Sequence, residues 1–122
     1  MSHEFEAISG KVIEAAIAVH KELGPGYVEP IYHRAMKVAM NHRQLPYESQ
    51  REVPIIFEGE EVGKHRMDLI AGRELIVELK AVNELLDVHF AQVKSYLKAT
   101  RLHAGLLMNF NATTLAVKRI VL

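Results

Sequence analysis

Apolar residues recur every three or four positions over the first part of the chain, with charged residues between them. This spacing is typical of one buried face of a helix, and it continues from Phe5 to Leu23, with Ser2 placed to cap the start. Gly24-Pro25-Gly26 follows. Glycine adopts the left-handed conformation after a helix and proline cannot continue one, so the first helix is expected to end here.

A second helical segment begins near Pro30, because proline is favoured at the first position of a helix. The segment is expected to run to about His42. Its buried side is predicted to consist of Ile31, Ala35, Val38 and Ala39.

Three shorter apolar stretches come next and predict an antiparallel meander of strands near residues 53–57, 62–70 and 75–80. Pro54 interrupts the first stretch, which indicates an edge strand or a bulge. The polar residues 58–61 predict the turn between the first two strands, and a turn containing Gly72 joins the second strand to the third.

Helical spacing returns from about Glu84 to Thr100, where Leu86, Phe90, Val93 and Leu97 form an apolar stripe. The continuously apolar residues 104–110 then predict a strand buried on both faces, parallel to strand 75–80 because a helix connects the two. Residues 118–122 supply a short last strand. The order predicts an α/β (α+β) fold, with a mixed sheet flanked by helices.

The composition indicates a single globular domain over residues 1–122. Fifteen Lys and Arg balance fifteen Asp and Glu, so any nucleic-acid binding must come from a local patch. The absence of Cys excludes disulfides, thiolate zinc sites and Cys nucleophiles. No membrane-spanning apolar run or signal-peptide pattern is present, so no membrane association and a cytoplasmic location are expected.

Charged side chains on the third strand need an explanation. Glu78 and Lys80 point to one face, whereas Leu75, Val77 and Leu79 point to the other, because strand side chains alternate. The hairpin brings Asp68 near Glu78. Buried charges are costly unless they pair or bind metal, so two carboxylates beside a lysine indicate a Mg²⁺ site; the alternative is a surface ion pair.

Asp68 followed by Glu78-Leu79-Lys80 resembles the D…ExK signature of the PD-(D/E)XK nuclease superfamily. Residues 26–32, Gly-Tyr-Val-Glu-Pro-Ile-Tyr, resemble the signature of the GxxExxY family, a small bacterial and archaeal branch. The resemblance implies a restriction-endonuclease-like αβββαβ core, makes Glu29 an additional metal ligand and makes Tyr32 a substrate-binding residue. Without it, Glu29 is a helix amino-terminal acid and Tyr32 a half-buried aromatic.

Gln92 and Tyr96 match the Q-x-x-x-Y element that RecB-like branches carry after the E-x-K strand. The resemblance implies that Gln92 orients phosphate or water. The alternative is an ordinary pair on the helix surface. Lys94, Lys98 and Arg101 on the other flank read as a solvated face. The seven His residues show no metal-ligand spacing, so each is expected to be structural or on the surface.

These observations predict a Mg²⁺- or Mn²⁺-dependent phosphodiesterase acting on DNA or RNA. Asp68 and Glu78 bind the metal with support from Glu29, and Lys80 positions the attacking water or neutralises charge on the phosphate. The substrate is oriented by Tyr32, Gln92 and Tyr96. A homodimer is expected, because a duplex cutter needs two sites and small domains often pair through edge strands.

Two alternatives remain at this stage. The first is a binding module that keeps the nuclease fold without cleavage, which the neutral net charge favours. The second is a structural subunit whose carboxylates are surface decoration, which requires Glu29, Asp68 and Glu78 to lie far apart. Strand preference and endo or exo cleavage stay open.

Overall fold

The computed structural model describes residues 2–122, with side chains from Ala7 onward. The predicted cap by Ser2 and the apolar contact of Phe5 therefore lie outside the described side chains. Along the chain the elements are α1 (Ser2–Leu23), α2 (Glu29–His42), β1 (Tyr47–Phe57), β2 (Glu60–Ala71), β3 (Leu75–Lys80), α3 (Asp87–Thr100), β4 (Ala104–Asn109) and β5 (Ala116–Val121).

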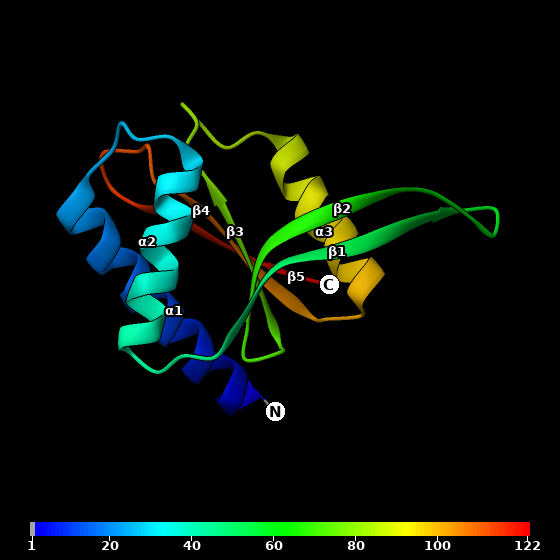
Figure 1. Cartoon of the computed structure of the whole chain (residues 1–122), viewed down its shortest axis with the longest axis horizontal. Helices are drawn as coiled ribbons and strands as arrows, with labels where there is room; N and C mark the ends of the chain where they lie inside the picture. The colour runs from blue at the N-terminus through cyan, green and yellow to red at the C-terminus, as the bar shows by residue number, and fades with distance from the viewer. Residues whose placement is uncertain (1) are drawn as a thin grey trace.

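The five strands form one sheet in the order β1-β2-β3-β4-β5 (Figure 1). Only β3 and β4 pair in parallel, and α3 connects them; the other neighbours are antiparallel. The predicted α/β fold with a mixed sheet, and the parallel crossover through the third helix, are therefore confirmed.

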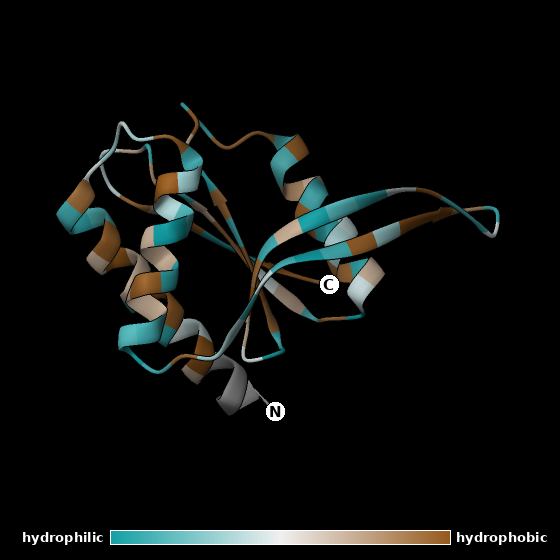
Figure 2. Ribbon diagram, viewed as in Figure 1, coloured by the Kyte–Doolittle hydropathy of each residue, from teal (hydrophilic) through white to brown (hydrophobic). Residues whose placement is uncertain are grey.

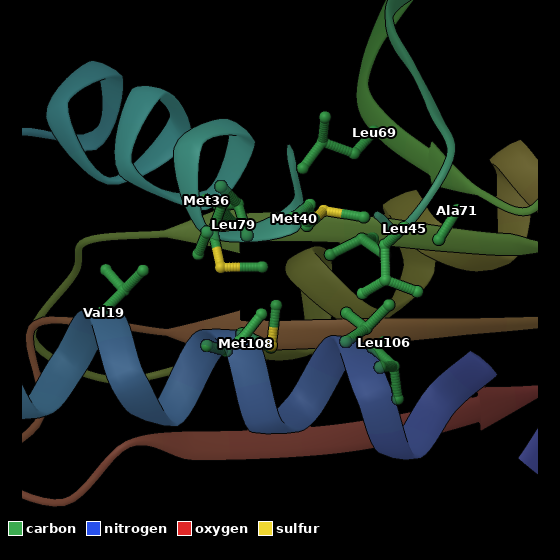
Figure 3. Close-up of a cluster of buried hydrophobic side chains, with 14 of the residues drawn as sticks. Val19, Met36, Met40, Leu45, Leu69, Ala71, Leu79, Leu106 and Met108 are labelled. Carbon is green, nitrogen blue, oxygen red and sulfur yellow. The ribbon is translucent and has the colours of Figure 1, made fainter. Parts of the chain in front are cut away.

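The sheet is covered on both faces. α1 and α2 bury one side of β3 and β4 in a cluster that includes Met36, Leu79 and Met108 (Figure 3). On the other side α3 packs Val93 and Leu97 against Ile76 and neighbouring residues. Because both faces are covered, every residue of β4 is buried, as its continuous apolar sequence predicted.

The buried side of α2 differs from the prediction. Its buried residues are Tyr32, His33, Met36, Ala39 and Met40, whereas Ile31 and Val38 are exposed. The prediction is confirmed for Ala39, which is buried, and for Ala35, which packs partly buried against the core, and it is wrong for Ile31 and Val38. The face of α2 against α1 and the sheet is instead filled by unbranched Met side chains and by one aromatic ring, which are also strongly apolar.

The β1–β2 hairpin closes through Glu58 and Gly59, which both have positive φ, 49° and 82°. This left-handed pair matches the twist of a two-residue hairpin. Pro54 lies on the edge strand, and a register shift follows between Ile55 and Ile56, so both features that proline predicted are present. In Figure 1 the hairpin extends past α3 and away from the body of the molecule.

Helix α3 begins at Asp87, three residues later than predicted. Leu86 is the cap residue, and its backbone N–H donates to His89 Nδ1 at 2.9 Å. This bond fixes the chain in an extended conformation just before the helix. Over residues 2–122, no helix is both long and apolar enough to cross a bilayer.

Candidate active site

Strands β2 and β3 pair over only three residues each, from Leu69 opposite Val77 to Ala71 opposite Leu75. Beyond this ladder, one backbone N–H group of each strand donates to a side-chain carboxylate and not to a backbone oxygen. The Asp68 N–H donates to Glu78 Oε1 at 3.0 Å, and the Leu79 N–H donates to Asp68 Oδ2 at 2.9 Å. Each carboxylate therefore accepts a backbone hydrogen bond from the opposite strand, which fixes both groups at the end of the ladder.

The two carboxylates share a poorly solvated space. Glu78 is only 4% exposed. Its burial, and then the charge of Asp68, raise the pKa of Glu78 to about 8 against an ordinary value of 4.5. Burial also raises the pKa of Asp68, although the Leu79 amide opposes this shift. The pair thus favours holding a proton or a cation over carrying two bare negative charges.

Lys80 supplies a positive charge beside the pair. It lies on the same face of β3 as Glu78, as strand alternation predicted, and its Nζ donates to Gln92 Oε1 at 3.1 Å. Its charge lowers the pKa of Asp68, Glu78 and Glu29, although by less than burial raises them. Gln92 on α3 therefore orients the ammonium group of Lys80 on β3.

Glu29 belongs to the same electrostatic group. It is the first residue of α2 and is half-buried. Burial and then the charge of Asp68 raise its pKa, while Lys80 and His33 lower it. The alternative of separate, solvent-exposed carboxylates on a structural subunit therefore does not hold, because Asp68 and Glu78 are adjacent and Glu29 interacts with both.

His33 was expected to be structural or on the surface, like the other histidines, and its place at the site was not predicted. It is 8% exposed, and its Nε2 lies 3.2 Å from the backbone oxygen of Asp68. It therefore joins α2 to β2 at the site. A usable signal was its spacing, since Glu29 and His33 are four residues apart and lie on one helix face.

With this geometry in place, the comparisons identify the family. The sequence matches the family model described as the PD-(D/E)XK nuclease superfamily over residues 6–120. The chain belongs to the PD-(D/E)XK nuclease superfamily. The match spans nearly the whole fold, including Glu29, Asp68, Glu78, Lys80 and Gln92.

A solved structure supports the fold of this superfamily member. The crystal structure of SSO0001 superposes with a TM-score of 0.62 at 21% sequence identity. The alignment covers 75% of this chain and 48% of that chain, so this protein corresponds to about half of SSO0001. Among curated proteins, no sequence matches this chain.

The two tyrosines of the sequence motifs occupy different environments. Tyr32 is fully buried, and its hydroxyl donates to the Gly24 oxygen at 2.6 Å and accepts from the Tyr27 N–H at 3.2 Å. Its ring stacks on Phe110 with centroids 4.9 Å apart. The structure therefore places Tyr32 in the core under the loop after α1, where its hydroxyl is bonded to the backbone on both sides of that loop.

Tyr96 lies closer to the superfamily residues. It is 3% exposed and contacts His65 edge to face, with ring centroids 5.3 Å apart. Burial, followed by the charges of Glu78, Asp68 and Glu29, raises its pKa. The alternative of an ordinary Gln92–Tyr96 pair on the helix surface is therefore wrong, because Tyr96 is buried. Its neutral ring forms part of the wall around the site.

The donor set fits a hard cation held at an open site. Within the described part of the chain, no three Asp, Glu, His or Cys side chains gather closely enough to enclose a metal. Mg²⁺ commonly binds through one or two protein carboxylates and keeps several waters. Asp68 and Glu78 meet this requirement, and the charge of Asp68 opposes the ionisation of Glu78, so a bound cation would offset the repulsion between them. Glu29 adds a third, half-buried carboxylate to the same electrostatic group.

Proposed function

We propose that this protein is a divalent-metal-dependent phosphodiesterase of the GxxExxY branch, acting on DNA or RNA in the cytoplasm. The proposal rests on the Asp68–Glu78 pair, whose carboxylates are fixed by reciprocal backbone hydrogen bonds beside the Lys80 ammonium. Gly26, Glu29 and Tyr32 support the branch. Residues 1–122 would then act as one nuclease-like domain.

A Mg²⁺ or Mn²⁺ ion would supply Lewis-acid activation of water and would offset negative charge on the scissile phosphate. Asp68 and Glu78 hold the ion in this proposal, and Glu29 adds negative charge to the same space. Lys80 directs its ammonium group at the water or at the phosphate charge that develops during attack. Gln92 keeps that ammonium in place through its 3.1 Å hydrogen bond.

In this proposal Tyr96 and Tyr32 have structural roles, although the family resemblance implied that both bind substrate. Tyr96 excludes water from one side of the site, because it is buried between α3 and the sheet. Tyr32 supports the loop that precedes Glu29 and so acts on the site through the position of α2. Substrate contact is therefore assigned to Lys80 and Gln92, which are only half-buried.

The test compares wild type with Lys80→Met and the control Lys118→Met, which changes an exposed strand lysine. Each protein is incubated with Mg²⁺ or Mn²⁺ and labelled single- and double-stranded DNA and RNA. Lys80→Met should lower the cleavage rate by about two orders of magnitude or more, the usual loss for one preorganised electrostatic group. Lys118→Met should cleave like wild type.

Equal cleavage by Lys80→Met and wild type would show that the assigned site is wrong. If no variant cleaves any strand but wild type binds one of them, the binding-module alternative replaces the nuclease. Melting temperatures measured on the same samples separate either result from unfolding.

A further inference from the structure

The far part of the β1–β2 hairpin, residues 55–63, carries three large apolar side chains that are more than half exposed. We call it the distal hairpin. Ile56, Phe57 and Val62 are 57%, 62% and 63% exposed. Figure 2 shows hydrophobic residues along the last part of β1, where the hairpin has left the body of the molecule. Single exposed apolar residues are ordinary, but Ile56 and Phe57 are consecutive in a strand and point to opposite faces, so the projecting hairpin exposes apolar side chains on both faces, which indicates a contact surface.

The charge of the distal hairpin restricts what that contact can be. Glu58, Glu60 and Glu61 are all exposed, and residues 55–63 contain no Lys or Arg. Three negative charges around an apolar tip repel a phosphate backbone, so a nucleic acid does not fit. A basic surface with apolar residues in its centre does fit.

The same chain carries such a surface at the far end of α3. Residues 88–122 contain five Lys and Arg and no Asp or Glu, so the neutral net charge conceals a strong separation of charge. A shallow groove of about 380 Å³ there is lined by Leu97, Lys98, Arg101, Leu102, His103 and Leu122. We call it the α3–β5 groove. Lys98 and Arg101 are exposed at its rim, and Leu122 is 55% exposed.

We propose that the distal hairpin of one copy docks in the α3–β5 groove of a second copy, and that the second copy's hairpin docks reciprocally. The hairpin does not fill its own groove, because its apolar side chains are exposed and it extends away from the body (Figure 1). A reciprocal arrangement satisfies both surfaces of both copies and closes as a two-fold dimer.

Side chains, not backbone pairing, form this contact. β1 is an edge strand, but Pro54 lacks an N–H and interrupts its row of donors just before the distal hairpin. A second shallow groove of about 430 Å³ lies between β1 and α3 of the same copy, and it is lined by Pro54, Ile55, Ile56, Ser95, Lys98 and Ala99. Lys98 thus borders the grooves on both sides of α3, where a partner's acidic tip would gain most from a positive charge.

The test uses two charge-reversed variants of the full chain, Glu60→Lys/Glu61→Lys in the hairpin and Lys98→Glu/Arg101→Glu at the groove. Sedimentation velocity over a range of concentrations should show a wild-type dimer. Each variant alone should dissociate at least about tenfold more readily, since both of its contacts then oppose like charges. Mixing the two variants should restore a dimer, because the mixed pair has opposite charges at both contacts.

The control Glu14→Lys/Glu22→Lys makes the same change of charge on exposed positions of α1 and should dimerise like wild type. Circular dichroism checks that each variant is folded. A wild type that stays monomeric, a variant that dimerises unchanged, or a mixture that stays monomeric would overturn the proposal. Loss of nucleic-acid binding in Lys98→Glu/Arg101→Glu with an unchanged dimer would assign the groove to nucleic acid and overturn it as well. None of these outcomes depends on catalytic activity.

Discussion

Asp68 accepts a backbone hydrogen bond and also contributes negative charge to the site, and these two properties can be separated by mutation. Asp68→Asn keeps an oxygen for the Leu79 amide but removes the charge. Calorimetric titration should therefore show that the Mn²⁺ affinity of Asp68→Asn is lower by about tenfold or more. Mutating a residue that only supports a metal ligand usually costs about tenfold in affinity, and replacing a ligand should cost at least as much. The control Asp87→Asn changes an exposed acid and should bind like wild type. Equal affinity in Asp68→Asn would remove Asp68 from the metal site.

Tyr32 tests whether a motif residue acts on substrate or on structure. Tyr32→Phe keeps the ring against Phe110 but removes the hydroxyl that bonds to Gly24 and Tyr27. Urea unfolding should show a loss of ~1 kcal/mol, the usual net value of a hydrogen bond. The control Tyr27→Phe changes a ring that is 46% exposed and should cost less.

The substrate-binding role that the motif implied for Tyr32 makes a different prediction. It requires Tyr32→Phe to weaken substrate binding in a protein of unchanged stability. Measuring both quantities on one preparation decides between the two roles.

At the scale of elements, the sequence predicted each helix and strand, and the errors concern where elements end and which face is buried. Helix α3 starts late because the bond between the Leu86 N–H and His89 fixes the end of the preceding loop, and a periodicity of apolar residues does not register such a bond. In α2 the buried face carries Met36 and Met40, which the predicted face did not include, whereas the predicted Ile31 and Val38 are exposed.

The same limits apply to the site. Strand alternation and hairpin geometry predicted the convergence of Asp68, Glu78 and Lys80, because those relations are local. The hydrogen bond between Lys80 and Gln92 depends on how α3 packs on the sheet, and the family resemblance indicated only that Gln92 belongs to the site. His33 and Asp68 are 35 positions apart in the sequence, so the four-residue spacing from Glu29 indicates which helix face His33 lies on but not its contact with the Asp68 backbone.

The packing of α3 on β4 depends on the absence of a side chain at Gly105. A Cβ there would lie 2.9 Å from Val93 Cγ1 and 3.3 Å from the Ile76 oxygen. Gly105→Ala should therefore push α3 from the sheet and lower the free energy of unfolding by about 1–3 kcal/mol, as overpacking usually does. The control Gly63→Ala places its Cβ in open space and should be nearly neutral.

Combining the substitution with Val93→Ala checks the cause. If the clash is responsible, Gly105→Ala should cost less in a Val93→Ala background than in wild type. If Gly105→Ala lowers the free energy of unfolding equally in both backgrounds, the close contact with the Ile76 oxygen, and not the contact with Val93 of α3, causes the destabilisation.

For the whole molecule, the buried carboxylates predict how stability depends on pH. Glu29, Asp68 and Glu78 all have raised pKa values, so the folded state keeps protons that the unfolded state releases. The free energy of unfolding of the metal-free protein should therefore decline as the pH rises from about 4.5 towards 8, the interval set by Glu78. Unfolding by urea at pH 5 and pH 8 in the presence of a chelator measures this decline.

The variant Glu78→Gln should reduce that decline, because its side chain does not titrate, whereas the exposed control Glu84→Gln should keep it. Mn²⁺ should stabilise wild type more at pH 8 than at pH 5, because the cation competes with protons for the carboxylates. A slope unchanged by Glu78→Gln would locate the titrating group elsewhere.

The short ladder between β2 and β3 also places two observable nuclei inside the site. The amide protons of Asp68 and Leu79 are bonded to carboxylates, whereas a regular ladder would pair them with carbonyl oxygens. Their resonance frequencies should therefore move when either carboxylate gains a proton or a cation, and their exchange with deuterium should slow when the cation holds the carboxylates in place. In an isotope-labelled sample the polypeptide thus supplies its own spectroscopic reporters of site occupancy, one on each strand.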